Sequence, residues 1–134
     1  SHPPPATRDS SLRLVGSEMC IRDRQRELDT AKATGKYVML DFYADWCTYC
    51  KEFEDYVFTN PDVQALLSDF VLLQADVTAN DNADQKLLAK TNVIAPPSIL
   101  FWDDNGQEKT KYRIVGAMNA QQFLERVNLI IKGN

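Results

Sequence analysis

The sequence predicts one α/β domain in which helices flank a central mixed β-sheet. Three apolar runs of strand length, over residues 36–44, 70–77 and 98–102, alternate with segments in which apolar residues recur at helical spacing. The first run is apolar on both faces, which is typical of a central strand covered by helices on both sides of the sheet. At 134 residues, 44% hydrophobic and 25% charged, the chain suits a single core.

Local signals predict the helices in the first half of the chain. A helix is expected over residues 24–34, because its composition favours a helix and Gly35 follows as a stop signal. The central strand leads into a second helix over residues 48–57. Asn60 and Pro61 then open a short helix, since an asparagine side chain accepts hydrogen bonds from free backbone N–H groups and proline is tolerated at the first helical position.

The second half is expected to contain two more helices around a hairpin. Residues 82–91 have helical spacing, with Leu87 and Leu88 facing inward. Asn119 caps a last helix that runs to residue 131. The inward-facing residues of that helix are Phe123, Val127 and Ile130 or Ile131.

A turn signal predicts the hairpin. The run Asp-Asp-Asn-Gly over residues 103–106 follows the strand over residues 98–102. It joins this strand to a fourth strand over residues 109–115. We therefore expect these two strands to pair antiparallel.

Residues 1–24 differ from the rest of the chain. Residues 1–11 are polar and proline-rich, as in a tag remnant or flexible linker. Residues 14–23, Leu-Val-Gly-Ser-Glu-Met-Cys-Ile-Arg-Asp, match the in-frame translation of a transposase sequencing adapter. We interpret residues 1–24 as tag, linker and adapter-derived artefact that is disordered or poorly ordered, and residues 25–134 as the domain. A native linker that happens to match the adapter is the alternative.

Two cysteines stand where the central strand passes into the following helix. The Cys47 thiol lies beside unpaired backbone N–H groups and the positive end of the helix dipole, both of which favour its thiolate. Cys47 is therefore the candidate nucleophile. Cys50, one helical turn later, is placed to resolve a mixed disulfide formed at Cys47.

Two other roles for this Cys-x-x-Cys motif stay open. A tetrahedral zinc site needs further cysteine or histidine ligands, and the chain offers only Cys20 and His2. A purely structural disulfide would close a ring too short to remove much chain entropy. Dithiol redox chemistry is the prediction that needs neither distant ligands nor an inefficient crosslink.

Three blocks of sequence resemble one known family. They are Val-Met-Leu-Asp-Phe-Tyr-Ala-Asp-Trp-Cys-Thr-Tyr-Cys-Lys-Glu-Phe-Glu (38–54), Val-Leu-Leu-Gln-Ala-Asp-Val-Thr-Ala-Asn-Asp (71–81) and Asn-Val-Ile-Ala-Pro-Pro-Ser-Ile-Leu-Phe (92–101). With the element order, they resemble the thioredoxin fold and, more narrowly, the C-terminal periplasmic domains of DsbD, the bacterial thiol:disulfide interchange protein. The resemblance covers residues 27–127. The family's edge strand before the first helix is either missing here or replaced by residues 12–15.

This resemblance implies an electron relay. In DsbD, a membrane-embedded domain takes electrons from cytoplasmic thioredoxin and reduces the C-terminal domain. The C-terminal domain then reduces the N-terminal periplasmic domain, which serves disulfide isomerases and cytochrome c biogenesis. By resemblance, Cys47 and Cys50 cycle between dithiol and disulfide without a diffusible cofactor, and the chain is a monomeric periplasmic domain of an inner-membrane protein.

Two carboxylates are candidates for control of the dithiol. Asp41 is the charged residue in the apolar central strand, and Glu54 shares a helix face with Cys47 and Cys50. We hypothesise that Asp41 and Glu54 hold Cys47 protonated until a partner docks, and that one of them moves the proton of Cys50. A solvated surface charge is the alternative for each carboxylate.

A docking surface is implied by the same resemblance. Pro97 resembles the cis-proline that lies against the Cys-x-x-Cys motif in this fold, and Trp46, Tyr49, Ala95 and Pro96 would border the surface on which a partner docks. The alternatives are a rigid trans turn at Pro96-Pro97, a core position for Trp46 and a plain loop position for Tyr49.

Composition narrows the classes of partner. The net charge of -4 without a basic cluster gives no support for nucleic acid. No apolar run approaches the roughly 18 residues that span a bilayer, so we expect no membrane insertion by this chain. Protein thiol or disulfide partners remain. The alternative functions are a free-standing periplasmic thioredoxin-like reductase and a redox-inert module that binds peptides.

Overall fold

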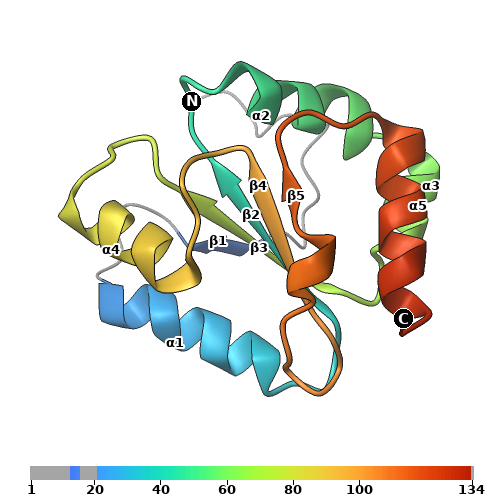
Figure 1. Ribbon diagram of the computed structural model, residues 1–134, viewed down its shortest axis with the longest axis horizontal. Helices are drawn as coiled ribbons and strands as arrows, with labels where there is room; N and C mark the ends of the chain where they lie inside the picture. The colour runs from blue at the N-terminus through green and yellow to red at the C-terminus, as the bar shows by residue number, and fades with distance from the viewer. Residues whose placement is uncertain (1–12, 16–20, 134) are drawn as a thin grey trace.

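The computed structural model describes residues 13–15 and 21–133, with side chains from residue 24 onward (Figure 1). The predictions made for residues 1–12 and for Cys20 lie outside the described residues. Where the structure describes the chain, no helix combines the length and the apolar character needed to cross a bilayer.

Five strands form one sheet. They are β1 (Arg13–Val15), β2 (Val38–Tyr43), β3 (Val71–Asp76), β4 (Ser98–Trp102) and β5 (Ile114–Val115), in the spatial order β1-β3-β2-β4-β5. β3 is parallel to both β1 and β2, whereas β4 is antiparallel to both β2 and β5. This mixed sheet confirms the predicted fold class, and β1 fills the edge that the sequence left open.

Helices cover both faces of the sheet. They are α1 (Ile21–Lys32), α2 (Thr48–Glu52), α3 (Pro61–Leu66), α4 (Asn82–Thr91) and α5 (Ala120–Ile131), with a π-helical turn η1 (Phe53–Val57) and a 3-10 turn η2 (Thr110–Tyr112). The local caps agree with the sequence: the Asn60 side chain caps α3, and Asn119 forms a capping box with Gln122 at the start of α5.

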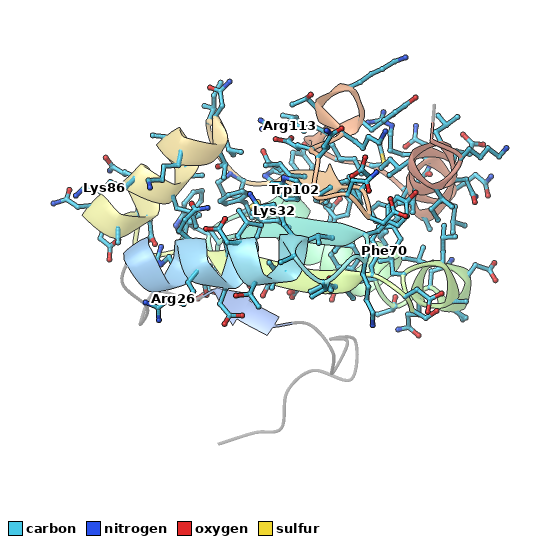
Figure 2. The ribbon with its side chains drawn as sticks, turned by 90° about the horizontal axis from the view of Figure 1, so that it is seen from below. Arg26, Lys32, Phe70, Lys86, Trp102 and Arg113 are labelled. Carbon is cyan, nitrogen blue, oxygen red and sulfur yellow. A yellow bond between two sulfur atoms is a disulfide. The ribbon has the colours of Figure 1, made fainter. Side chains whose placement is uncertain are left out.

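Alternating residues of β2 face two separate cores, because successive strand side chains point to opposite faces. Leu40 and Phe42 pack with residues of α1 and α4 in one core. Met39 packs in the other core with residues of η1, α3 and α5. Figure 2 shows the first of these layers, where Lys32 of α1 lies over Trp102 of β4 with its Nζ 5.9 Å from the ring centre.

The predicted inward residues are buried in these cores. Leu87 and Leu88 lie in the core beneath α1 and α4, and Phe123, Val127 and Ile130 lie in the core beneath α5. Ile131 is exposed. The helical spacing in the sequence therefore identified the buried faces of α4 and α5 correctly.

The start of the domain differs from the sequence prediction. α1 begins at Ile21 rather than at residue 24, and Arg24 is fully buried in an ion pair with Asp84 of α4. Residues 13–15 and 21–24 therefore belong to regular elements, although the sequence predicted poor order up to residue 24. The order comes from distant partners, the β3 ladder and Asp84, which local composition does not reveal. The division of the chain at residue 24 stays a prediction.

The fourth strand is shorter than predicted. Ile114 and Val115 pair antiparallel with β4 as expected, but residues 110–112 form η2. The Tyr112 N–H donates to the Lys109 carbonyl oxygen at 2.9 Å, so a local hydrogen bond replaces the ladder here. The predicted hairpin is confirmed, with an interruption on its second side.

Candidate active site

The two cysteines meet where β2 passes into α2. Cys47 and Cys50 form a disulfide with Cα atoms 5.3 Å apart. Cys47 is the N-cap of α2, and its sulfur accepts a hydrogen bond from the Cys50 N–H at 3.2 Å. Both residues are buried, with Cys47 at 6% and Cys50 at 3% exposure. The more exposed of the two cysteines thus lies at the helix end that favours a thiolate.

Cys50 also contacts the central strand β2. Its sulfur lies 3.7 Å from the carbonyl oxygen of Phe42. In the disulfide this sulfur carries no proton, so the contact becomes a hydrogen bond only in the reduced thiol. The proton of reduced Cys50 therefore has an acceptor on β2, one residue from Asp41.

The helix after the cysteines changes its winding before Glu54. The Phe58 N–H donates to the Phe53 carbonyl oxygen at 2.8 Å, a bond between residues five apart. Such π-helical turns shift the helical register and occur often at functional sites. The single helix predicted over residues 48–57 is therefore built in two parts, α2 and η1. Glu54 lies half-buried in the second part.

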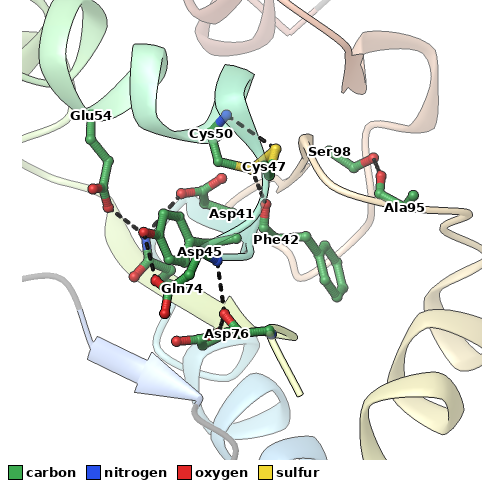
Figure 3. Close-up of a disulfide and its surroundings, with 12 residues drawn as sticks. Asp41, Phe42, Asp45, Cys47, Cys50, Glu54, Gln74, Asp76, Ala95 and Ser98 are labelled. Carbon is green, nitrogen blue, oxygen red and sulfur yellow. Dashed lines mark hydrogen bonds between the residues drawn. A yellow bond between two sulfur atoms is a disulfide. The ribbon is translucent and has the colours of Figure 1, made fainter. Parts of the chain in front are cut away.

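Gln74 joins the two predicted carboxylates. Its Nε2 donates to Asp41 Oδ2 and to Glu54 Oε2, each at 3.2 Å (Figure 3). The β2–β3 register pairs Asp41 directly with Gln74, so the two side chains lie side by side. Asp41 is 4% exposed, which excludes the solvated surface charge considered from the sequence.

Sequence reasoning missed Gln74. The available signal was one amide inside the apolar run over residues 70–77, but its partners depend on the strand register. The nitrogen rather than the oxygen must face the carboxylates, because an oxygen there would repel both. The buried Gln74 Oε1 has no hydrogen-bond partner among the described residues. Among the described residues, the side-chain hydrogen bonds of Gln74 therefore go only to the two carboxylates.

Two exposed aromatic residues lie next to the cysteines in sequence: Trp46 precedes Cys47 and Tyr49 precedes Cys50. Trp46 is 58% exposed and Tyr49 is 51% exposed, so Trp46 does not occupy the core. The Trp46 indole N–H donates to the Thr78 carbonyl oxygen at 3.0 Å. One edge of the ring is therefore held by the loop after β3 while its surface remains open to solvent.

The segment over residues 92–97, called the proline loop below, lies between α4 and β4. Its Pro96-Pro97 peptide bond is cis, as the resemblance predicted. Ala95 is exposed, and Pro96 and Pro97 are half-buried. Ile94, which the sequence reasoning did not single out, is 97% exposed. In Figure 3, Ala95 lies on the opposite side of the disulfide from Glu54.

The alternative of a zinc site requires further ligands beside Cys47 and Cys50. Among the described residues, no three histidine, cysteine, aspartate or glutamate side chains form a group that would hold a metal ion. Cys20 and His2, the further zinc ligands considered from the sequence, lie outside those residues.

Comparison with known proteins points to one group of domains. A family model described as a thioredoxin-like domain matches residues 24–131. The thiol:disulfide interchange protein DsbD of Escherichia coli strain CFT073 is 56% identical over 92 residues. That match covers 69% of this chain but 16% of the length of that protein.

Solved structures give a match of domain size. The C-terminal domain of Neisseria meningitidis DsbD in the oxidised form is 33% identical, with a TM-score of 0.68, over 81% of this chain and 93% of that chain. The reduced form is 32% identical, with a TM-score of 0.67, over 81% of this chain and 94% of that chain. The similarity therefore extends over nearly the whole of that domain.

Proposed function

Because the chain belongs to the thioredoxin-like domain family and, within it, to the C-terminal domains of DsbD, we propose that it relays two electrons from a membrane-embedded domain to a periplasmic partner domain. The chain is a thiol:disulfide oxidoreductase. The observation that carries the relay proposal is a disulfide at the N-cap of α2, with exposed aromatic side chains at Trp46 before Cys47 and at Tyr49 before Cys50.

The reduced chain transfers its electrons in two exchanges. The Cys47 thiolate attacks one sulfur of the partner disulfide, so that a Cys47–partner S–S bond forms, the partner's own S–S bond breaks, and the released partner thiolate takes up a proton. Cys50, after losing its proton, attacks the Cys47 sulfur, which forms the Cys47–Cys50 disulfide and releases the second partner thiolate, and this thiolate also takes up a proton. Together with the proton that the Cys47 thiol gives up when its thiolate forms, the chain loses two electrons and two protons, and the partner gains the same.

We assign the proton steps to the two bridged carboxylates. Asp41 and Glu54 are held together by Gln74, and their negative charge opposes a thiolate on Cys47 until a partner docks. Asp41 is next to Phe42, whose carbonyl oxygen contacts Cys50. In this proposal Asp41 takes the Cys50 proton during resolution, and the half-buried Glu54 links it to solvent.

Partner docking is assigned to the surface around the disulfide. The exposed side chains of Trp46 and Tyr49, with Ala95, Pro96 and Pro97 of the proline loop, supply apolar surface for a partner segment. Contact with this surface would bring the partner disulfide to Cys47.

The rest of the relay lies in other domains. The match covers 16% of DsbD, so the electron donor and acceptor in this proposal are the membrane-embedded and N-terminal domains of such a protein. The membrane domain would reduce the Cys47–Cys50 disulfide by the reverse of the two exchanges above, on the periplasmic side of the inner membrane. Both steps use protein thiols and need no diffusible cofactor.

A trapping experiment tests the relay. The Cys50→Ser variant cannot resolve, so with the oxidised N-terminal domain of E. coli DsbD it should form a mixed disulfide that is visible on a non-reducing gel. Cys47→Ser is the matched control and should form none. The same gel with wild-type protein should show reduced partner without an adduct. An absent adduct with Cys50→Ser, or full activity of Cys47→Ser, would contradict the proposal.

A further inference from the structure

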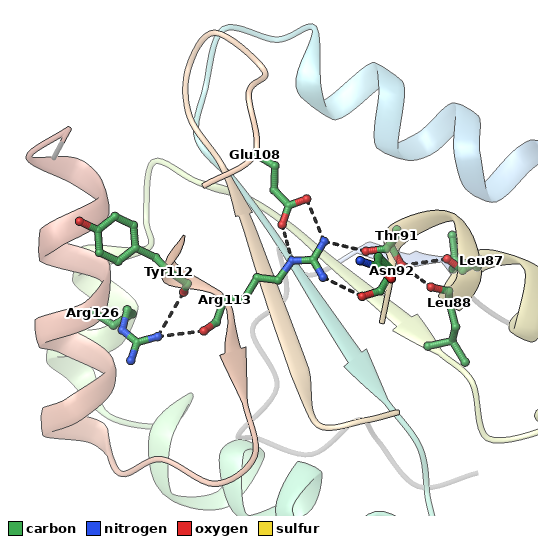
Figure 4. A network of polar contacts seen from close by, with 8 residues as sticks. All are labelled: Leu87, Leu88, Thr91, Asn92, Glu108, Tyr112, Arg113 and Arg126. Carbon is green, nitrogen blue, oxygen red and sulfur yellow. Dashed lines mark hydrogen bonds and ion pairs between the residues drawn. The ribbon is translucent and has the colours of Figure 1, made fainter. Parts of the chain in front are cut away.

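The proline loop is held in place by one side chain from the opposite side of the hairpin. Arg113, between η2 and β5, donates from Nη2 to the Thr91 carbonyl oxygen at 2.6 Å and from Nη1 to the Asn92 carbonyl oxygen at 2.9 Å (Figure 4). These carbonyl groups end α4 and begin the proline loop. The last carbonyls of a helix have no partner within the helix, so a guanidinium fork is well matched to them.

Other contacts fix the direction of the Arg113 fork. Glu108 accepts from Arg113 Nε at 2.5 Å and from Nη2 at 3.0 Å, which is a two-point pair that sets the plane of the guanidinium. The hydrogen bonds that Arg113 donates to Glu108 raise the pKa of Arg113, so its charge is permanent. Arg126 of α5 donates to the Arg113 carbonyl oxygen at 2.9 Å and thereby holds the backbone from which the fork extends.

The far end of the proline loop is held by residues at the ends of β4 and β5. The Gly116 N–H donates to the Pro97 carbonyl oxygen at 3.1 Å, and the Ser98 hydroxyl donates to the Ala95 carbonyl oxygen at 2.8 Å. Asn92 adopts the left-handed conformation, with φ of 58°, where the chain leaves α4. The direction of the loop is therefore set at its two ends.

Between these ends the loop spans a hollow. A cavity of 120 Å³ is lined by Val93, Ile94, Ala95, Leu100, Arg113 and Val115. Val93 packs against the core beneath α1 and α4, but Ile94 is 97% exposed and Ala95 is exposed, so packing holds the start of the loop and not residues 94–95. The position of Ala95, next to the cis-proline pair, thus depends on Val93 and on the anchors at residues 91–92 and 97–98.

We propose that Arg113 is a positioning residue that holds the proline loop in the conformation that docks protein partners. This inference rests on the proposed function, because it concerns the surface to which docking was assigned. Arg113 does not touch the disulfide, so it acts on the association with a protein and not on the sulfur chemistry. Small disulfides, which reach Cys47 without the loop, do not need it.

The test compares a protein disulfide with a small one. Reduced wild type, Arg113→Met and Arg113→Lys are mixed with increasing oxidised N-terminal domain of E. coli DsbD, and separately with dithiobis(nitrobenzoic acid). Arg113→Met should need about tenfold more protein partner for half-saturation at an unchanged limiting rate, since apparent affinity scales with the population of the docking conformation. Its rate with the small disulfide should equal that of wild type.

Lys111→Met is the matched control. It removes the same charge from a neighbouring residue, whose Nζ lies 5.5 Å from the Tyr112 ring. This control should behave as wild type. Arg113→Lys keeps the charge but not the fork and should resemble Arg113→Met. Wild-type behaviour of Arg113→Lys, or an equal loss with both disulfides in Arg113→Met, would overturn the inference.

Amide hydrogen exchange separates this inference from the relay itself. The Val93 N–H, which donates to the Leu88 carbonyl oxygen at 2.8 Å, should exchange faster in Arg113→Met than in Lys111→Met, while amides of β2 exchange alike. Failure of wild type to reduce the protein partner would contradict the proposed function. The exchange rates of the Val93 amide in Arg113→Met and Lys111→Met could still be compared. Equal exchange of Val93 in the two variants would refute the role of Arg113 whatever the partner result.

Discussion

Replacing Asp84 by asparagine should strongly destabilise the domain. Asp84 of α4 pairs with Arg24 of α1, and both side chains are 0% exposed. Asp84→Asn preserves the shape of the side chain but removes its charge. The guanidinium of Arg24 cannot release its proton, so a buried positive charge is left without its carboxylate.

The expected loss follows from complete burial. Breaking a buried ion pair by removing one partner costs about 3 to 5 kcal/mol of unfolding free energy. For a domain of this size, that loss lowers the melting temperature by about 12 to 20 °C. An exposed pair gives the contrast: Lys32 and Asp29 lie 3.4 Å apart with side chains 30% and 58% exposed, and Asp29→Asn should cost less than about 1 kcal/mol.

Urea unfolding followed by circular dichroism measures these differences. The double variant Arg24→Met with Asp84→Met should recover most of the loss, because no buried charge remains. If Asp84→Asn unfolds within 1 kcal/mol of wild type, about the value of an exposed pair, the strong contribution of the buried Arg24–Asp84 pair to stability is refuted. If the double variant is as unstable as Asp84→Asn, the loss comes from packing or from the capping bond that Asp84 accepts from the Asp81 N–H, and not from the buried charge.

Three further predictions concern the domain boundary, the dithiol and alkaline pH. A chain that begins at Gln25 lacks Arg24 and β1, so its unfolding free energy should fall by an amount comparable to that of Asp84→Asn; equal stability would support the boundary drawn from the sequence. Asp41→Asn combined with Glu54→Gln should lower the pKa of the Cys47 thiol, because two negative charges near the thiolate are removed. The pH dependence of Cys47 alkylation measures this pKa, and Asp55→Asn is the control. An unchanged profile would contradict the role of the carboxylates. Burial, with Asp104 and Asp103 nearby, raises the pKa of Tyr37, so the stability that its neutral phenol contributes is present below pH 10 and is lost as the pH rises through the higher folded value. Tyr37→Phe should therefore reduce the loss of unfolding free energy above that pH, whereas Tyr56→Phe should not.

Local chemistry explains where the sequence predictions were accurate. The bounds predicted for residues 82–91 and 98–102 agree with α4 and β4, because caps and apolar runs mark those ends within a few residues of sequence. The hairpin turn is likewise held locally, since the Asp103 side chain accepts from the Asn105 and Gln107 N–H groups at 2.9 and 3.0 Å. The family blocks carried the expectation of a cis bond at Pro97.

Long-range register explains where they fell short. The contact of Gln74 with Asp41 depends on the pairing of β2 with β3. The ion pair of Arg24 with Asp84 depends on the packing of α1 on α4. The hydrogen bond from Arg113 to the proline loop is also a long-range contact, because Arg113 lies 21 residues beyond Asn92 in sequence. No local sequence pattern marks any of these three contacts.

By itself the sequence determined the dithiol motif, the alternation of strands and helices, and the resemblance that identifies the family. These depend on residue identity and on spacing within one element or one turn. Only the tertiary structure decided which polar groups share one environment: Asp41 with Gln74 and Glu54, Arg24 with Asp84, and Arg113 with the end of α4. The physical reason is that a buried polar group is stabilised by whichever partner the packing of distant elements brings within hydrogen-bonding distance.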